Sequence, residues 1–277
     1  MAYTTIDKPT DYFNTKLYTG NAVDGSGTTQ SVTGVGFQPD WVWIKSRSAT
    51  KSHYLFDVVR GATKQLNSNN ANDENTGSTS LTAFGSDGFT LGSEPEVNEQ
   101  NATFASWNWK CETSFTNDAS STGIGSIDSS GSVSNTAGFS IVIRTGTASA
   151  GTIKHGLSTT PKMIITKMRN ASENWGVYHV GIGNTKYLKL DVTDAEDSSS
   201  GVWNNTTPTT SVFSVGNSAL VNGSGKTYVD YIFSDVKGYS KFSSFVGNGS
   251  SDGTYVHLGF KPAFVMVKQI NASGEGW

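Results

Sequence analysis

One short segment occurs three times in this chain and constrains its fold more than any other feature. It reads GFQPDWVWIKSRSAT at residues 36–50, GLSTTPKMIITKMRNAS at 156–172 and GFKPAFVMVKQINAS at 259–273. Each copy contains a glycine, then a proline placed just before four strand-forming residues, and then a lysine. Repetition of such a pattern indicates that one folding unit was copied along the chain.

The repetition extends well beyond this segment. Lys45 recurs 122 positions later as Lys167. The stretch FTLGSEPEVNEQNATFASWNW aligns with FSVGNSALVNGSGKTYVDYIF without a gap, and FNTKLYTG aligns with FSIVIRTG. Because the order is kept and the spacing drifts by only a few residues, we expect two homologous units, at residues 13–110 and 139–233.

The local pattern along these units is typical of antiparallel β structure. Short runs rich in Val, Ile, Thr and aromatic residues alternate with clusters of Gly, Ser, Asn and Asp. No window carries a sustained apolar stripe with helical spacing. We therefore predict an all-β fold of tandem antiparallel β-sandwich repeats, jelly-roll-like with about eight strands each. An immunoglobulin-like arrangement of about seven strands remains open.

The repeats divide the chain into five parts. We expect an N-terminal attachment segment at 1–12, a first β-sandwich repeat at 13–110, a Gly/Ser-rich linker at 111–138, a second repeat at 139–233, and the start of a third, incomplete repeat at 234–277. An incomplete sandwich would leave strand edges open. That favours a chain that continues beyond Trp277 over completion of the sheet by another chain.

The alternation within the repeated strands predicts which side chains are buried. At residues 41–44 both faces are mostly apolar, which is typical of a central strand covered on both sides. In the closing strands at 103–109 and 227–233, one face carries large aromatics such as Trp107 and Trp109. We expect that face to point into its own sandwich.

Two residue types in the repeats invite a functional interpretation. Lys45, Lys167 and Lys268 occupy the same position in each copy, and we expect each to lay its stem along the sheet and donate to a loop carbonyl. The tryptophans could stack on sugars, but their alternation within strands favours core packing. Trp203, in the polar stretch GVWNNTTP, is the tryptophan that we expect to be exposed.

The sequence contains no recognisable catalytic or metal-binding motif. The histidines are scattered, and the single cysteine, Cys111, excludes an internal disulfide. Acidic loops at 69–77 and 191–200 fall at equivalent places but lack the spacing of a calcium-binding loop, so we expect solvated loops. We therefore assign no catalytic, cofactor-binding or metal-binding residue, expect no cofactor, and leave receptor-binding residues unassigned.

Composition excludes several classes of protein. Charged residues make up 16% of the chain, and the net charge of −3 gives no electrostatic footprint for nucleic acid or an anionic membrane. No run of about 20 apolar residues could cross a bilayer as a helix. The start of the chain lacks the basic and apolar regions of a secretory signal peptide. We expect neither nucleic acid nor membrane as a partner.

The first repeat carries phrases that are distinctive of a known family. They are MAYTTIDKPTDYFNTKLYTGN, SVTGVGFQPDWVWIKSRS, LFDVVRGATK, FGSDGFTLG and FASWNWK. These phrases resemble a repeat module of virion proteins from marine tailed bacteriophages, especially the tail-fibre-like and surface-appendage proteins of cyanophages and related ocean phages. The resemblance covers the first repeat almost completely and the second more loosely. The family has no established catalytic residues, so none is carried over.

The resemblance implies a bacteriophage virion structural protein, tail-fibre- or spike-like, that presents β-sandwich modules for attachment to the host surface. The alternative is a capsid-decorating or tail-structural protein with a purely mechanical role. In either case we expect the protein at the surface of the extracellular virion, docked to other virion proteins through residues 1–12. A host-surface glycan or outer-membrane protein is the candidate receptor, and a homotrimer is the favoured oligomer.

A third possibility is an enzyme that degrades host polysaccharide. Such an enzyme needs two carboxylates about 5 to 9 Å apart on a groove. The candidates are Asp87, Glu94, Glu96 and Asp191, but their neighbours are turn-forming residues. We therefore expect that the protein is not an enzyme.

Overall fold

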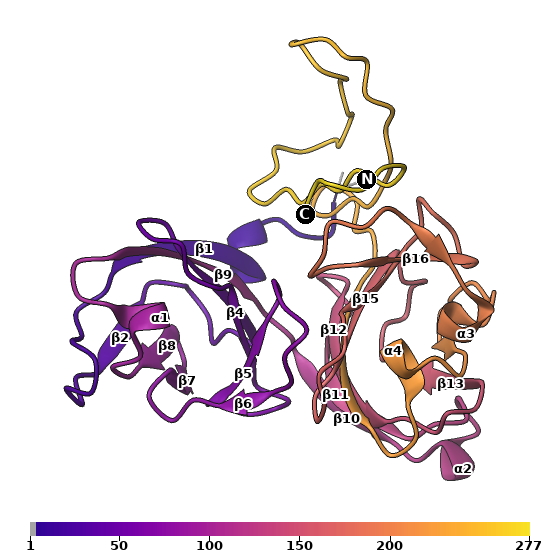
Figure 1. Cartoon of the computed structure of the whole chain (residues 1–277), viewed down its shortest axis with the longest axis horizontal. Coiled ribbons are helices and arrows are strands. Elements are labelled where there is room, and N and C mark those ends of the chain that lie inside the picture. Colours follow the sequence, from indigo (N-terminus) through magenta and orange to yellow (C-terminus); the bar gives the residue numbers. More distant parts are fainter. Residues whose placement is uncertain (1–3) are drawn as a thin grey trace.

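The chain folds into two β-rich units followed by an extended C-terminal segment (Figure 1). A computed structural model describes residues 4–277. Within this range strands dominate, and each α-helix has only four residues. Neighbouring strands of the sheets pair antiparallel. The predicted all-β class is therefore confirmed.

The first unit runs from β1 to β9 and is preceded by a short 3-10 helix, η1 (Pro9–Asp11). Its elements are β1 (Phe13–Thr19), β2 (Gln30–Thr33), β3 (Trp41–Ser46), β4 (Tyr54–Asp57), β5 (Lys64–Asn67), β6 (Asn75–Thr76), β7 (Leu81–Gly85), β8 (Gly88–Leu91), α1 (Pro95–Asn98) and β9 (Thr103–Trp109).

Two sheets form the first unit. The larger has the strand order β1-β9-β3-β4-β5-β6, and the smaller has the order β2-β8-β7. Apolar side chains fill the space between them, including Val42, Ile44 and Phe104 from the larger sheet and Phe89 and Leu91 from the smaller. As predicted, β3 is a central strand with both faces buried.

The second unit runs from β10 to β19. Its elements are β10 (Thr113–Asn117), α2 (Ala119–Thr122), β11 (Ser129–Ser134), β12 (Phe139–Thr145), β13 (Gly151–Lys154), β14 (Met163–Met168), β15 (Gly176–His179), β16 (Lys186–Lys189), β17 (Asp197–Ser198), α3 (Ser200–Trp203), β18 (Val212–Val215), α4 (Ala219–Asn222) and β19 (Thr227–Phe233).

The sheets of the second unit follow the strand order of the first. Its larger sheet contains the order β12-β19-β14-β15-β16-β17, which matches β1-β9-β3-β4-β5-β6 in sequence order and position. The small sheet β13-β18 takes the place of β2-β8. The core between the sheets contains Val142, Ile164 and Ile232 on one side and Ile153 and Phe213 on the other.

The prediction of a Gly/Ser-rich linker at 111–138 is wrong. β10 pairs with β11, and β11 pairs with β12, so this segment extends the larger sheet of the second unit. Small residues suit the position because the strands approach closely: a Cβ on Gly131 would lie 2.0 Å from the carbonyl oxygen of Ile141. Ladder hydrogen bonds come from the backbone, so a composition typical of linkers also suits this strand.

The large aromatics of β3 and β9 do not point into the core of the first unit. Trp41, Trp43 and Trp109 lie on the opposite face of the sheet from Val42 and Ile44, and they pack against the second unit. The predicted burial of these tryptophans is confirmed. The prediction that the aromatic face of the closing strand points into its own sandwich is wrong, because the second unit covers that face.

Trp203 is buried, so the prediction that it is exposed is wrong. The polar stretch around it forms α3, a single helical turn that begins at the capping side chain of Ser199 and ends at Asn204 in a left-handed backbone conformation. This turn places Trp203 in the core of the second unit, with its ring centroid 5.9 Å from that of Tyr178.

One buried asparagine occupies the same place in each unit. Asn98 Nδ2 donates to the carbonyl of Gly92 at 2.8 Å, and Asn222 Nδ2 donates to the carbonyl of Gly216 at 2.7 Å. Both side chains belong to fully buried residues. The two asparagines also align in the sequence, so the alignment of the units extends to an individual hydrogen bond.

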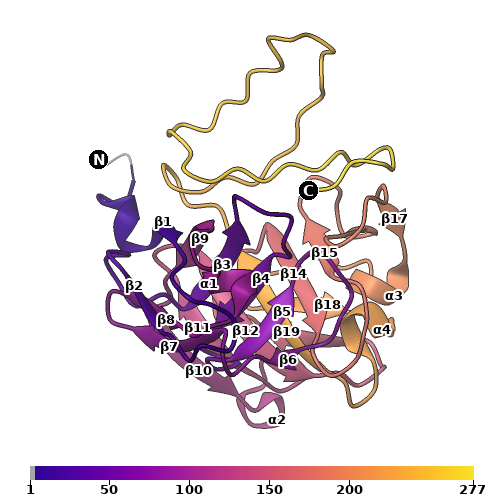
Figure 2. The same cartoon turned by 60° about the vertical axis from the view of Figure 1, so that its left-hand side comes forward.

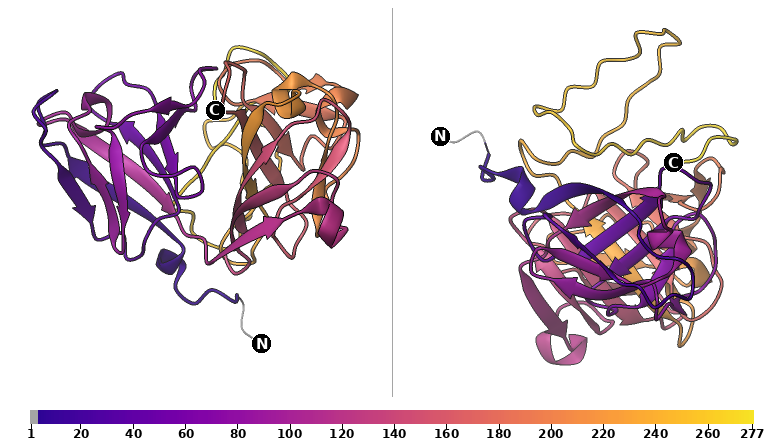
Figure 3. Two further views of the ribbon diagram at one scale, coloured as in Figure 1. Left: turned by 90° about the horizontal axis from the view of Figure 1, so that it is seen from below. Right: turned by 90° about the vertical axis from the view of Figure 1, so that its left-hand side faces the viewer.

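Residues 234–277 form the C-terminal segment, which runs away from both units and returns across their upper end (Figures 2 and 3). Within these residues the structure contains no named strand, so the predicted start of a third repeat has no sheet of its own. Phe264, Met266 and Trp277 nevertheless pack against the apolar cluster between the two units.

The predicted attachment segment at 1–12 lies partly outside the described residues, because residues 1–3 are not described. Its described part contains a buried Ile6 and the helix η1, directly before β1. Attachment through this segment stays a prediction.

Replacing Asn222 with alanine should lower the free energy of unfolding by about 3 kcal/mol. The change removes donors to the Gly216 and Ser149 carbonyls and an acceptor for the Thr147 N–H, and it leaves the buried Gly216 carbonyl without its partner. Chemical denaturation measures the effect, and Asn98→Ala should behave alike. Asn217→Ala, at an exposed position, is the control; an equal loss there would contradict this account.

Candidate functional site

The two units meet through stacked aromatic rings. Trp41 stacks on Tyr231 at a centroid distance of 4.3 Å, and it also contacts Phe139 and Phe233 at 5.7 and 6.0 Å. Trp109 contacts Phe139 at 6.3 Å. We call this contact, formed by Trp41 and Trp109 of the first unit and Phe139, Tyr231 and Phe233 of the second, the joint. Its rings remove a large apolar area from water, and offset aromatic pairs add to that stabilisation.

A buried charge network lies beside these rings. The Tyr231 hydroxyl donates to Asp57 Oδ2 at 2.7 Å, and Arg60 Nη2 donates to the Tyr231 oxygen at 3.2 Å. Arg60 and Asp57 also form an ion pair whose side chains are wholly inaccessible to solvent. Burial raises the pKa of the Tyr231 hydroxyl well above its usual value, so the hydroxyl keeps its proton and remains a donor.

Glu74 connects two arginines across the joint. Its Oε2 accepts from Arg60 Nη1 at 3.1 Å, and its two oxygens accept from Arg169 Nε and Nη2 at 2.9 and 3.0 Å. Burial alone would raise the pKa of Glu74, but the two guanidinium groups lower it overall. The carboxylate therefore stays ionised and binds the first unit to the second.

The loop at 67–74 of the first unit is held by Lys167 of the second. Lys167 Nζ donates to the carbonyl oxygens of Ala71, Met168 and Glu173 at 3.1, 2.9 and 2.9 Å. The residue has no solvent-accessible surface. Burial lowers the pKa of its ammonium group to about 8, although nearby carboxylates oppose the shift.

Trp175 completes the contact with the same loop. Its Nε1 donates to the carbonyls of Asn67 and Asn70 at 2.9 and 3.2 Å. Two backbone bonds run alongside, from Glu74 N to the Arg169 carbonyl at 2.8 Å and from Glu173 N to the Ala71 carbonyl at 2.9 Å.

The C-terminal segment repeats this set of bonds on the second unit, at the loop 189–196. Lys268 Nζ donates to the Thr193 carbonyl at 3.2 Å, and Trp277 Nε1 donates to the Lys189 carbonyl at 2.9 Å. The two backbone bonds recur as well, from Glu196 N to the Ile270 carbonyl at 2.8 Å and from Gly274 N to the Thr193 carbonyl at 3.0 Å.

We call the lysine, the tryptophan and the two backbone bonds the loop-docking contact. In both cases a segment that follows the repeated strand binds the backbone of a loop in the preceding unit. Backbone carbonyls serve as acceptors whatever the side chain is. This explains how Asn67 and Lys189, or Ala71 and Thr193, can play the same role.

The structure assigns the three repeated lysines to packing and hydrogen bonding. Lys45 Nζ donates to the Ser46 and Ala49 carbonyls at 3.1 and 3.5 Å, and the other two lysines bind carbonyls as described above. The prediction of a lysine bonded to loop carbonyls is therefore confirmed. The acidic loops at 69–77 and 191–200 are partly or fully exposed to solvent, as predicted, and their backbones in addition accept these bonds.

The histidine at the strand end of the first unit is also a packing residue. Trp43 Nε1 donates to His53 Nδ1 at 2.8 Å. Burial, with a smaller contribution from Lys45, lowers the pKa of His53 to about 4. Tyr54 pairs with Ile44 in the first unit, and Gly176 pairs with the matching Thr166 in the second, so Tyr54 and Gly176 are equivalent. The residues before them, His53 and Trp175, are therefore equivalent too.

Three of the four candidate carboxylates of an enzyme each have a partner of their own. Asp87 accepts from the backbone of Gly34 and Gly36, at 2.9 and 2.6 Å. Glu96 lies 3.9 Å from the ammonium of Lys51. Asp191 Oδ1 accepts from the Trp175 N–H at 2.9 Å. Glu94 is the residue before α1.

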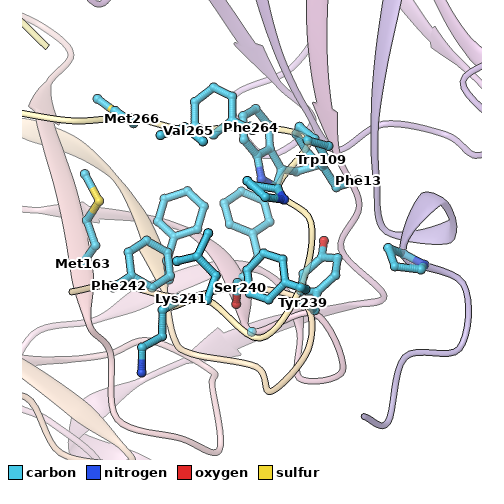
Figure 4. Close-up of a pocket in the computed structure, with 18 of the residues that line it drawn as sticks. Phe13, Trp109, Met163, Tyr239, Ser240, Lys241, Phe242, Phe264, Val265 and Met266 are labelled. Atoms are coloured by element: carbon cyan, nitrogen blue, oxygen red, sulfur yellow. The ribbon is translucent and has the colours of Figure 1, made fainter. Parts of the chain in front are cut away.

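A cavity of about 620 Å³ opens between the two units and the C-terminal segment (Figure 4). Its walls are mostly apolar and include Phe13, Trp109, Met163, Phe242 and Phe264. No carboxylate is found among the described residues that line it. The cavity can therefore accept apolar groups.

Residues 4–277 contain neither a candidate metal site nor a membrane-spanning helix. No group of three or more His, Cys, Asp or Glu side chains in that range could hold a metal ion. None of its helices has the length and apolar character needed to span a membrane. Cys111 is a free, buried thiol beside the joint, and burial raises its pKa well above the usual value.

The charge network was not predicted from the sequence. Asp57 ends β4 and Arg60 stands in the turn that follows, and the matching positions of the second unit are His179 and Ile182. Because the repetition does not extend to these charges, comparing the units gave no signal for them. Arg169 stands two residues after the repeated Lys167, so an expected contact between this strand and the loop would have identified it.

Comparisons with known proteins bear on the family alone. The model of one protein family, described as a domain of unknown function (DUF7483), matches residues 8–277. Neither the curated proteins nor the solved structures contain a match to the chain.

Replacing Lys167 with methionine should lower the free energy of unfolding by about 2 kcal/mol. The change leaves three carbonyls without their charged donor, while it relieves part of the cost of burying an ammonium group. Urea denaturation measures the difference. Lys45→Met is the matched control and should cost less than about 0.5 kcal/mol, because Lys45 is partly exposed. Equal losses would contradict a special role for Lys167.

The same pair of proteins should show a defined pH dependence. The ammonium of Lys167 has a pKa of about 8 when folded and about 10.4 when unfolded, so between these values the unfolded chain binds the extra proton. Stability contributed by this position therefore rises as the pH increases from 8 to 10. The stability advantage of the wild type over Lys167→Met should grow by about 1 kcal/mol per pH unit in that window. A constant difference would show that Lys167 is not desolvated.

Proposed function

Since the chain belongs to the DUF7483 family of domains of unknown function, we propose a function from its sequence resemblance and its packing. It is a bacteriophage virion structural protein, tail-fibre- or spike-like, whose β-sandwich modules serve attachment to the host surface. The proposal rests first on the phrases that resemble virion modules, among them SVTGVGFQPDWVWIKSRS and FASWNWK.

The two units are, in this proposal, tandem copies of one sandwich module with a jelly-roll-like arrangement. Three observations support the copying: the matching strand orders, the matching Asn98 and Asn222 hydrogen bonds, and the loop-docking contact formed twice. Repeat proteins gain stability from such contacts between neighbouring units.

The packing and hydrogen bonding of the distinctive side chains is the observation that supports a structural role. The repeated lysines bind backbone carbonyls, and Trp41 and Trp109 of the quoted phrases are packed in the joint. Of the candidate carboxylates, Asp87, Glu96 and Asp191 each have a partner of their own. This pattern supports a protein whose residues serve assembly, and we propose that it is not an enzyme.

A purely mechanical role, as a capsid-decorating or tail-structural protein, is the second candidate. The contact between the units favours it, because Glu74 of the first unit forms an ion pair with Arg169 of the second and is held in place by Arg60, which pairs with Asp57. In both versions the protein lies at the virion surface and contacts other virion proteins. A host glycan or outer-membrane protein as receptor, and a homotrimeric state, belong to the fibre version.

Binding to the host separates the two versions. Fluorescently labelled protein should bind cells of the bacterium that the phage infects, should leave a resistant strain unlabelled, and should compete with phage adsorption. Flow cytometry and electron microscopy with gold-labelled antibody are the measurements. Label on the tail with host binding supports the fibre; label on the capsid without host binding supports the mechanical role. Absence from purified particles would contradict both.

A further inference from the structure

We propose that the end of the first unit at residues 45–53 is a docking surface for a loop of the same kind as 67–74 and 189–196. The loop would belong to the unit that contains Lys268 and Trp277, so that three units close into a ring around the joint. This inference rests on the proposed copying of modules, and it is independent of any role in a virion.

The C-terminal segment contacts the aromatic rings of the first unit in the same way as the first unit contacts those of the second. Trp41 contacts three rings of the second unit: Phe139, Tyr231 and Phe233, at 5.7, 4.3 and 6.0 Å. Phe264, at the position of Trp41 in the third copy of the repeated segment, contacts the three matching rings of the first unit: Phe13, Trp107 and Trp109, at 6.1, 5.7 and 5.6 Å.

The strand registers make this match specific. Phe13 pairs with Trp109 as Phe139 pairs with Phe233, at the same ends of β1–β9 and β12–β19. The second unit therefore packs on the first, and the first packs on the C-terminal segment in the same sense. The loop-docking contact adds the remaining link, from the C-terminal segment to the second unit.

Three contacts of the same kind, each between two of the three units, form a closed ring. An interface that joins different surfaces on successive units closes into a ring when its rotation divides a full turn, and otherwise it continues as a helix. Here the third member touches both of the others, through Phe264 on the first unit and Trp277 on the second. Contact with both neighbours is the mark of a ring of three.

Two of the three links are half formed. The second unit and the C-terminal segment share the loop-docking contact, and the first unit makes its three aromatic contacts with Phe264, but within residues 4–277 no loop is docked at Lys45. Lys167 and Lys268 each donate to a carbonyl of a neighbouring unit, at Ala71 and Thr193, whereas Lys45 donates only within its own turn, to Ser46 and Ala49. An ammonium has three donors, so Lys45 retains one for a docked carbonyl.

His53 can take the role that an indole plays in the other two contacts. Its Nδ1 accepts from Trp43 Nε1 at 2.8 Å, so the neutral ring carries its proton on Nε2. That N–H stands at the position of Trp175, whose Nε1 donates to the Asn67 carbonyl. A docked loop would thus meet a lysine and a ring N–H, as the other two loops do.

Exposed apolar surface marks the same side of the first unit. Leu17 on β1 is 56% exposed, whereas Ile143, at its position on β12, packs against the cluster of the joint. Trp107 is only partly buried, whereas Tyr231, its counterpart on β19, is fully buried. The rest of the third unit would cover Leu17 and Trp107, and it would fill part of the apolar cavity drawn in Figure 4.

The test is an extension of the chain. Trp277 aligns with Trp175, so residues 176–233 are appended after Trp277 to complete a third unit with strands of the second. We expect a folded monomer in which amide hydrogen exchange at residues 46–53 slows about tenfold relative to the parent chain. Lys45→Met should restore fast exchange in the extended protein while changing the parent by less than about twofold. Lys16→Met, elsewhere on the first unit, is the matched control and should change neither.

Each other outcome opposes the proposal. An extension that folds without protecting residues 46–53 overturns it. So does an extension that stays unfolded and is trimmed by protease back to the parent, both with residues 176–233 and with the alternative residues 54–110, since a completed ring should be stable. A parent chain that associates with itself through residues 45–53 would make the occupant a second copy instead. None of these results bears on host binding, so this inference and the proposed function can fail separately.

Discussion

The stacking of Trp41 on Tyr231 is the contact on which the arrangement of the whole molecule depends. It takes the face of β3 that points away from its own sandwich and covers it with the second unit. Because that face is apolar, the sheet has to be buried on both sides, and a single sandwich in water would expose a row of indoles. The units are therefore parts of one packed body, in which the core of each sandwich and the cluster between the sandwiches are separate layers.

The units share a framework but differ in their buried charges. In the second unit Arg144 and Asp230 form a wholly buried pair inside the sheet, with Arg144 over the Tyr228 ring at 4.7 Å. In the first unit the position of Arg144 is Tyr18, which stacks on Phe104 at 5.1 Å. The buried charges of the first unit lie instead at Asp57 and Arg60, beside the rings of the joint. Replacing a cation–π contact with an aromatic stack keeps the volume filled, so the framework tolerates the exchange.

Sequence reasoning recovered the all-β class, the central strand and the role of the lysines, because each depends on local periodicity or on repetition. It failed where the answer depends on what lies on the other side of a sheet. Alternation shows that Trp107 and Trp109 share a face, but it cannot say whether a sandwich or a neighbouring unit covers that face. Composition misled at 111–138, since glycine and serine suit both linkers and closely spaced strands. Trp203 was misjudged because a single helical turn has no periodicity to detect.

The hairpin β10–β11 has a consequence for how copies of this molecule meet one another. It occupies the outer side of β12, so the end strand of the larger sheet is β10 in the second unit, whereas it is β1, the counterpart of β12, in the first. An end strand offers unpaired backbone groups to any extended peptide, and a short one offers fewer. β1 has seven residues and carries the exposed Leu17, whereas β10 has five, so sideways growth of a sheet, as in aggregation or in strand exchange between molecules, is favoured on the first unit.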